Sequence, residues 1–207
     1  MEIFPKGKLI TFEGSEGSGK STQAKLLYDY LKSKKKSVVF IREPGGVKIS
    51  EMIRQFLLDV KNKEMTDICE TLLYMAARAQ LVHELIVPAL KKGKIVLCDR
   101  FLDSTVVYQG YGNGVDLSFI KAVGHKVTQG ISPDLTFVFD IETEQGFSRK
   151  GKERDRIEQR SLPYHNRVRA GYLQLARQEP HRIKLLKADR PREEIQKEIQ
   201  TVVTELL

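Results

Sequence analysis

The sequence predicts an α/β fold in which a mainly parallel sheet of five strands is flanked by helices in three layers. Short β-prone runs alternate with segments of helical spacing along the whole chain. One of these runs, 94–98, is apolar almost throughout, as expected of a strand that is buried on both faces of a parallel sheet. The connections between parallel strands should be right-handed, and ligands should bind where the strands end.

The first elements surround a glycine-rich turn. Residues 9–12 form a short β-prone strand that leads into this turn. The helix that follows is indicated by apolar residues at helical spacing, namely Ala24, Leu27, Tyr28 and Leu31. A second strand is expected at 37–41, with helices at about 49–58 and 67–90. Pro88 and Gly93 should stop the longer of these two helices.

The remaining elements repeat the alternation. The strand at 94–98 is followed by the polar pair Asp99 and Arg100, which should point into the ligand crevice. Further strands are expected at 135–139 and 183–186, and helices at about 158–177 and 191–206. No internal repeat or long linker divides the chain, so we expect its 207 residues to form a single domain, 1–207.

The composition indicates what kind of partner the protein binds and in which compartment it is expected. Lys and Arg number 35 against 27 Asp and Glu, and the formal charge of +8 suits an anionic partner. The two cysteines, Cys69 and Cys98, lie in apolar stretches far from other metal ligands, which favours buried free thiols. The first eight residues lack the apolar core of a signal peptide, and no apolar run is long enough to span a membrane. We therefore expect a cytoplasmic protein without a membrane partner.

The glycine-rich turn carries the pattern GxxxxGK[ST] between a predicted strand and a predicted helix. Such a P-loop turns backbone N–H groups inward at a helix start and so binds phosphate. Lys20 should reach the β- and γ-phosphates of ATP, and Ser21 should ligate Mg²⁺. The expected ATP-binding residues are Gly14, Ser15, Glu16, Gly17, Ser18, Gly19, Lys20, Ser21 and Thr22. This motif predicts the P-loop NTPase fold.

The loop alone leaves a kinase, a switch or a motor open. A GTPase switch would carry NKxD and DxxG segments, and the nearest approach, residues 62–65, fails at its last position. A kinase of small molecules instead needs arginines that gather two anionic substrates. The alternative interpretation of the basic residues at 149–160 as a nucleic-acid surface is weak, because there is little aromatic interleaving and no recognised module.

Five further segments carry a resemblance to a known family. They are Arg42-Glu43-Pro44-Gly45-Gly46, 72–78 (LLYMAAR), 99–105 (DRFLDST), Tyr108-Gln109-Gly110 and Asp155-Arg156-Ile157-Glu158. Together with the P-loop, they closely resemble thymidylate kinase of the bacterial type, from the first strand through the last helix. REPGG together with the P-loop is highly specific for this family, whereas an isolated DR or YQG is weak.

The resemblance implies roles for the acceptor site. Arg42 and Arg100 would hold the phosphate of dTMP, and a guanidinium does this well because it binds two oxygens at once. Tyr74 would stack on thymine, Arg78 would hydrogen-bond the base, and Glu16 would receive the sugar 3′-hydroxyl. The dTMP-binding residues are then Glu16, Arg42, Pro44, Tyr74, Arg78, Arg100, Ser104, Thr105, Tyr108 and Gln109. A surface ion pair for the arginines, or a plain core tyrosine, remains an alternative.

The resemblance also implies a mobile lid at approximately 147–159 that excludes water from ATP. Its basic residues are Arg149, Lys150, Lys152, Arg154, Arg156 and Arg160. In the bacterial type the lid supplies the arginine that stabilises the transferring group, so Arg149 or Arg154 is the candidate. Asp155 and Glu158 would help to close the lid. The lid is about two residues shorter than the family pattern, and Phe101 and Tyr74 replace a usual tyrosine and phenylalanine.

The combined expectation is a homodimeric enzyme that transfers the γ-phosphoryl group of ATP to dTMP with Mg²⁺ as cofactor. The catalytic residues would be Lys20, Arg42, Arg100 and Arg149 or Arg154, and Asp99 would join Ser21 at the metal through a water contact unless it serves only as a helix cap. No nucleic-acid partner is expected. A kinase of another nucleoside monophosphate or of a nucleoside, and a P-loop module without phosphotransfer, remain alternatives.

Overall fold

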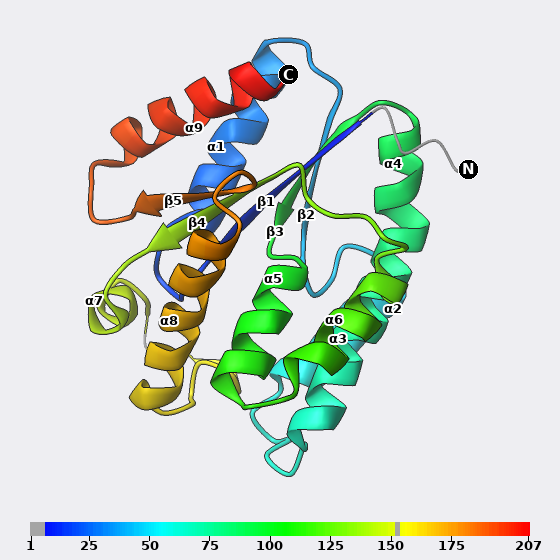
Figure 1. Ribbon diagram of the computed structural model, residues 1–207, viewed down its shortest axis with the longest axis vertical. Coiled ribbons are helices and arrows are strands. Elements are labelled where there is room, and N and C mark those ends of the chain that lie inside the picture. The colour runs from blue at the N-terminus through cyan, green and yellow to red at the C-terminus, as the bar shows by residue number, and fades with distance from the viewer. Residues whose placement is uncertain (1–6, 152–153) are drawn as a thin grey trace.

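The strands lie in one sheet in which every adjacent pair is parallel. The computed structural model describes residues 7–151 and 154–207, and its five-stranded sheet has the order β2-β3-β1-β4-β5. The strands are β1 (Lys8–Gly14), β2 (Val38–Arg42), β3 (Ile95–Asp99), β4 (Leu135–Asp140) and β5 (Ile183–Lys187). All strands therefore end at one edge, and this edge is where the predicted loop and polar residues meet (Figure 1).

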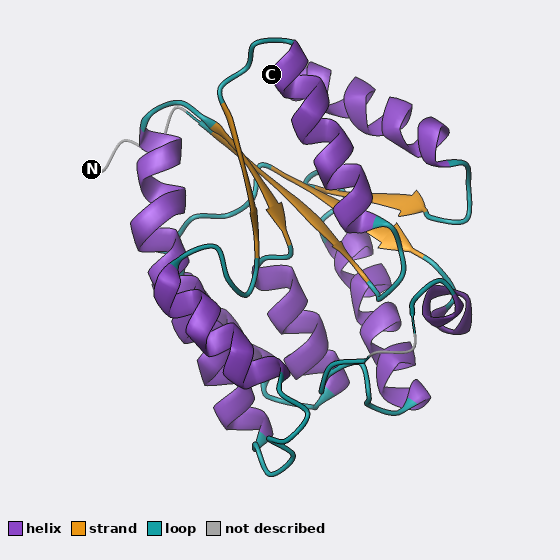
Figure 2. Ribbon diagram, turned by 180° about the vertical axis from the view of Figure 1, so that it is seen from behind, coloured by secondary structure: helices purple, strands orange, loops and turns teal. Residues whose placement is uncertain are grey.

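Helices cover both faces of the sheet and confirm the three layers. α1 (Lys20–Ser33) and α9 (Arg192–Leu206) pack on one face, where they bury Ile10 and Phe12 of β1. The other face carries Leu9 of β1 and is covered by helices from the middle of the chain and by α8 (Leu162–Gln178) (Figure 2). Successive strand residues point to opposite faces, so a strand covered on both sides is apolar throughout.

The remaining helices differ in part from expectation. They are α2 (Lys48–Leu58), α3 (Asp67–Leu81), the π-helix η1 (Val82–Ile86), α4 (Val87–Lys91), α5 (Leu102–Thr105), the π-helix η2 (Val106–Gly112), α6 (Leu117–Val127) and α7 (Thr143–Ser148). The expectation that Pro88 stops the long helix is wrong. Pro88 lies at the start of α4, directly after the π-turns of η1, and such a widened turn accommodates a ring that lacks an N–H.

Two further expectations need correction. The predicted helix at 158–177 begins at Leu162, because residues 156–159 form turns and Ser161 precedes the first helical turn. Cys69 is exposed near the start of α3, whereas Cys98 of β3 is buried as expected. Among the described residues, no helix has the length and apolar character that crossing a membrane would need.

Candidate active site

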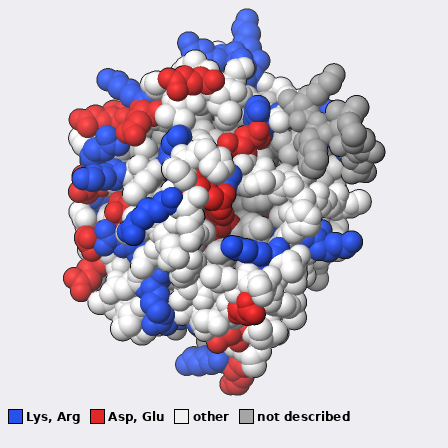
Figure 3. All heavy atoms as spheres, viewed as in Figure 1, with Lys and Arg blue, Asp and Glu red and all other residues white. Residues whose placement is uncertain are grey.

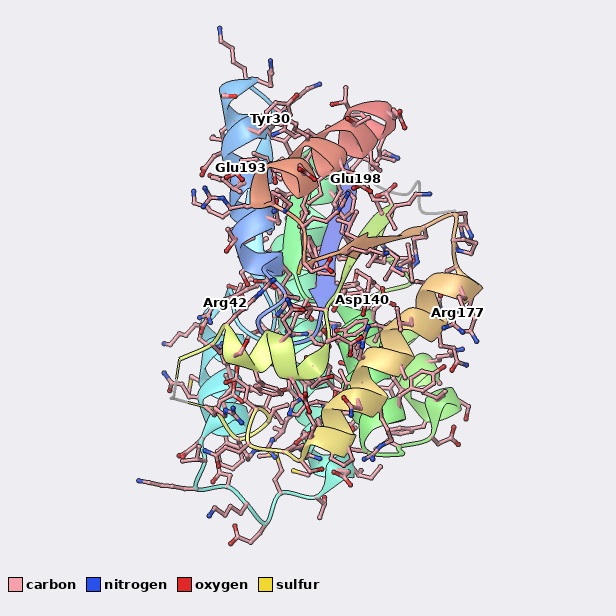
Figure 4. The ribbon with its side chains drawn as sticks, turned by 90° about the vertical axis from the view of Figure 1, so that its left-hand side faces the viewer. Tyr30, Arg42, Asp140, Arg177, Glu193 and Glu198 are labelled. Atoms are coloured by element: carbon pink, nitrogen blue, oxygen red, sulfur yellow. The ribbon has the colours of Figure 1, made fainter. Side chains whose placement is uncertain are left out.

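A cavity of about 690 Å³ lies at the ends of β1, β2 and β3 and collects most of the predicted site residues. In Figure 4, the labelled residues Arg42 and Asp140 lie on either side of the end of β1, at the edge of the sheet where the cavity is found. The predicted residues that line the cavity are Glu16, Lys20, Ser21, Arg42, Pro44, Tyr74, Arg78, Asp99, Arg100, Ser104, Thr105, Tyr108 and Gln109. The predicted residues outside its lining are Gly14, Ser15, Gly17, Ser18, Gly19, Thr22, Arg149 and Arg154.

The P-loop runs from the end of β1 to the start of α1. Gly14, Gly17 and Gly19 all have positive φ, so this backbone path depends on residues without a Cβ. Lys20, the first residue of α1, is buried, and burial lowers the pKa of its ammonium group. The buried hydroxyl of Ser18 has no hydrogen-bond partner among the described residues. A helix start, a buried cation and a free hydroxyl form a site that an anion would complete.

The P-loop also touches α7 (Thr143–Ser148), the helix that leads into the predicted lid segment. A Cβ on Gly17 would lie 1.9 Å from the carbonyl oxygen of Gly146 in α7, and a Cβ on Gly146 would lie 2.4 Å from the carbonyl oxygen of Glu16. Neither position can therefore carry a side chain without displacement of backbone. The two segments pack main chain against main chain.

Arg100 and Glu16 join the P-loop to the predicted acceptor site. Arg100 Nη2 donates to Glu16 Oε1 at 2.6 Å and to Tyr108 Oη at 3.0 Å, and Nη1 donates to Ser104 Oγ at 3.2 Å. Burial raises the pKa of Glu16, but Arg100, Lys20 and Lys150 together hold it well below its usual range. Arg100 itself has φ 71°, a strained conformation that points to a functional constraint on its side chain.

Sequence reasoning missed Glu13, which is fully buried one residue before the P-loop. Its carboxyl accepts from Phe101 N at 2.6 Å, Ser104 Oγ at 2.5 Å and Tyr172 Oη at 2.8 Å. Burial, followed by the charge of Asp103, raises the pKa of Glu13 to about 7. The available signal was a carboxylate in a strand that is otherwise expected to be apolar, which marks an unusual interior site.

The far end of the cavity is built around Arg78. Its Nε donates to Glu43 Oε2 at 2.7 Å, its Nη1 to Thr105 Oγ1 at 3.0 Å and its Nη2 to Phe101 O at 3.0 Å. The guanidinium is thus held in one orientation, because hydrogen bonds engage all three of its nitrogens. Tyr74, one turn earlier on α3, also faces the cavity, and burial raises the pKa of its hydroxyl.

Arg42 is half exposed at the end of β2, where its Nη2 lies 3.2 Å from Glu51 Oε2. Beside it, Arg54 Nη1 donates to Pro44 O at 2.9 Å and lines the same cavity, a contribution that the sequence did not suggest. Burial lowers the pKa of Arg54, and the neighbouring charge of Arg42 adds to this. Several guanidinium groups therefore face one cavity from different elements.

The predicted catalytic arginines of the lid do not face the cavity in this structure. Arg149 Nη1 donates to Ala188 O at 2.9 Å, and the Arg154 guanidinium stacks 4.6 Å from the centre of the Phe147 ring. From the predicted lid segment, Lys150, Asp155, Ile157 and Glu158 line the cavity instead. The Nζ of Lys150 lies 3.6 Å from Glu16 Oε2 and pairs with Glu158. Lys152 lies outside the described residues.

The residues at the metal position fit a hard cation. Asp99 is buried at the end of β3, and its Oδ1 has no hydrogen-bond partner among the described residues, while Ser21 lines the same cavity. In 7–151 and 154–207 there is no group of three His, Cys, Asp or Glu that could hold a metal ion by itself. A Mg²⁺ ion here would thus take its remaining ligands from water and substrate phosphates, as is usual for this ion.

Comparisons with known proteins agree with this architecture. The family model described as thymidylate kinase matches residues 12–199. A thymidylate kinase from Symbiobacterium thermophilum is 49% identical over 96% of this chain and 93% of its own, and one from Halothermothrix orenii is 50% identical over 94% and 95%. The solved thymidylate kinase of Ehrlichia chaffeensis has a TM-score of 0.77 and 34% identity, over 96% of this chain and 99% of its own. The chain therefore belongs to the thymidylate kinase family.

Proposed function

We propose that the protein phosphorylates dTMP to dTDP with ATP, with both substrates meeting in the cavity at the ends of β1, β2 and β3. The observation that carries the proposal is that Lys20 and Ser21 of the P-loop line the same cavity as Arg78 and Arg100. The volume of about 690 Å³ lies in the range of small-molecule sites. Membership of the family supplies the substrates.

Different residues of the cavity would bind the donor and the acceptor phosphates. In the proposed reaction, an oxygen of the dTMP phosphate attacks the γ-phosphorus of ATP in line, and the bond to the β-phosphate oxygen breaks to leave ADP. No covalent enzyme intermediate forms. Lys20 and the P-loop backbone hold the donor phosphates, whereas Arg42 and Arg100 hold the acceptor phosphate. Arg42 would exchange Glu51 for that phosphate.

The thymidine part of dTMP would lie at the far end of the cavity. Tyr74 would stack on the base, Arg78 would donate to it, and Thr105 and Gln109 would read its polar edge beside Pro44. Tyr108 and Ser104 would lie near the sugar and phosphate. Glu16 would accept a hydrogen bond from the 3′-hydroxyl. An ionised carboxylate is the stronger acceptor, and the low pKa of Glu16 supports this role.

Mg²⁺ is the proposed cofactor. When bound, the ion would neutralise charge that develops between the donor phosphates. Ser21 would ligate it directly, and Asp99 would contact it through water. The buried Asp99 Oδ1, which lacks a partner among the described residues, supports this assignment.

Arg149 or Arg154 remains the proposed arginine for the transferring group, and residues 147–159 the proposed lid of a single domain. Both side chains lie outside the cavity, so either would have to move to reach the phosphates. Replacing each arginine with alanine and measuring turnover at saturating substrate tests this proposal. Loss of the arginine that stabilises the transferring group should lower kcat by roughly 100-fold or more. An unchanged rate for both variants would remove both candidates, and Lys150 would be tested next.

A homodimer is proposed through an apolar stripe on α2 and α3. Met52 and Phe56 are 61% and 54% exposed on one face of α2, and Ile68 and Leu72 are 49% and 45% exposed on one face of α3. The helices pack side by side, and we propose that these four side chains together form one apolar surface. Such a surface favours contact with another protein, and a second copy would cover it with its own stripe. The cytoplasm is the proposed location.

The activity is tested by following ADP formation with dTMP, UMP, CMP, AMP, GMP and thymidine offered separately. The highest kcat/KM is expected for dTMP, and ADP formation should depend on the acceptor. Highest activity with UMP or thymidine would contradict the acceptor assignment. ATP turnover that does not depend on any acceptor would contradict phosphotransfer itself.

A further inference from the structure

Glu70 of α3 is a completely buried carboxylate next to the proposed base-binding end of the cavity. Its Oε1 accepts from Gln109 Nε2 at 2.9 Å and from Asn113 Nδ2 at 3.2 Å. Its Oε2 accepts from Arg160 Nη2 at 2.9 Å and lies 2.7 Å from Arg156 Nη2. Amide groups thus surround one oxygen, and guanidinium groups surround the other.

This arrangement fixes which way the amide of Gln109 points. An ionised carboxylate can only accept hydrogen bonds, so Gln109 must present its NH₂ group to Glu70 and its oxygen to the other side. Gln109 lines the cavity. Among the described residues, no donor makes a hydrogen bond to the side-chain oxygen of Gln109. This oxygen is also not fully buried, so it remains accessible from the cavity.

We propose that Glu70 is a specificity-determining positioning residue: it turns the Gln109 carbonyl toward the acceptor base and so selects a base that offers an N–H donor at its N3 position. The proposal rests on the proposed function. Thymine carries such a donor at N3, whereas cytosine carries a lone pair there. A hydrogen-bonding site rejects an analogue that leaves its buried polar group unpaired. Glu70 touches neither substrate in this scheme and acts through Gln109.

The variant Glu70→Gln tests the orientation directly. The guanidinium groups of Arg156 and Arg160 require an acceptor, so the introduced glutamine should turn its oxygen toward them and its NH₂ group toward Gln109. Gln109 should then reverse and offer N–H to the base. The ratio of kcat/KM for dTMP to that for dCMP should fall by roughly 5- to 150-fold, the equivalent of one unpaired buried group. A merely structural role would lower both values together and leave the ratio unchanged.

A double variant provides the reverse test. In Glu70→Gln with Gln109→Glu, the glutamine introduced on α3 can donate to one oxygen of the glutamate introduced on η2, and the other oxygen of that carboxylate again offers an acceptor to the base. The preference for dTMP should return. This variant also carries the test if Glu70→Gln alone does not fold, because its loss of the dTMP preference would overturn the proposal.

Asp67→Asn is the matched control. Asp67 lies one turn earlier on α3, and its Oδ1 is 3.6 Å from Arg160 Nη2, so this change removes a charge from the same cluster without contact to Gln109. Its dTMP to dCMP ratio should equal that of the wild type. An unchanged ratio in Glu70→Gln would overturn the role of Glu70, whereas failure of the wild-type protein to phosphorylate dTMP would overturn the proposed function instead.

Discussion

Glu13→Gln should change how the stability of the protein depends on pH. The carboxyl of Glu13 is fully buried, and its pKa is raised from 4.5 to about 7, first by burial and then by the charge of Asp103. Glutamine has nearly the same shape and can accept from Phe101 N while donating to the hydroxyl oxygens of Ser104 and Tyr172. The variant therefore keeps the geometry around Glu13 and removes its titration.

The sign and size follow from proton linkage. Between pH 4.5 and about 7, the folded protein keeps the Glu13 proton and the unfolded chain has lost it. Folding is thus most favoured by this group below pH 4.5, and its contribution is lost as the pH rises through about 7. At about 1.4 kcal/mol per pH unit, the free energy of unfolding should fall by about 3 kcal/mol relative to the variant.

Urea unfolding followed by circular dichroism at several pH values measures this difference, since the chain has no tryptophan for fluorescence. The free energy of unfolding of Glu13→Gln minus that of the wild type should increase as the pH rises from 4.5 through about 7. Leu185→Ala, at an exposed position on β5, changes no ionisable group and should give a constant difference. A flat curve for Glu13→Gln would refute the raised pKa.

Three other changes test separate parts of the structure. Arg100→Lys keeps the charge but loses the planar guanidinium, so kcat/KM for dTMP should fall at least about tenfold, and an unchanged value in the ADP assay would contradict its role. Leu27→Ala empties a completely buried position in the core under α1 and should cost about 3 kcal/mol in urea unfolding, with a loss below about 1 kcal/mol as the contrary result. Phe56→Lys should shift the protein to a monomer in sedimentation velocity, and an unchanged dimer would place the contact on another surface.

The five strands could be predicted because each has a local signature, most clearly the apolar run of β3. The helices at 102–127 could not, because Val106 and Val107 are β-branched and Gly110, Gly112 and Gly114 follow them closely. The structure gives a packing reason for one of them. A Cβ on Gly112 would lie 2.6 Å from the ring of Tyr164, so the glycine serves a helix contact and not a loop.

For the site, residues inside contiguous motifs were found and residues held by distant contacts were not. Arg100 follows a buried strand and Tyr74 stands in a specific segment, so both could be named in advance, and both line the cavity. Glu13 meets Tyr172, which is 159 positions away, and Glu70 meets Arg160, which is 90 positions away. No local pattern encodes such pairs, because they exist only once the sheet has brought the helices together.

The surface charge shows a similar limit. The excess of basic residues indicated an anionic partner, but acidic and basic side chains are interspersed over the face shown in Figure 3. Much of the positive charge that matters lies inside the cavity, on Lys20, Arg78 and Arg100. A net charge counts these groups together with solvated lysines, so it could suggest the class of ligand but not the place where the ligand binds.

The contact between Gly17 and Gly146 limits which substitutions the P-loop can accept. An arginine introduced into the P-loop at position 17 would need space that the main chain of α7 already occupies. Positive charge for the transferring phosphoryl group cannot be added at that point of the loop while α7 stays in place, and it must come from another segment. Sequences that share this backbone should therefore keep glycine at both 17 and 146, a pattern that an alignment of relatives can reveal.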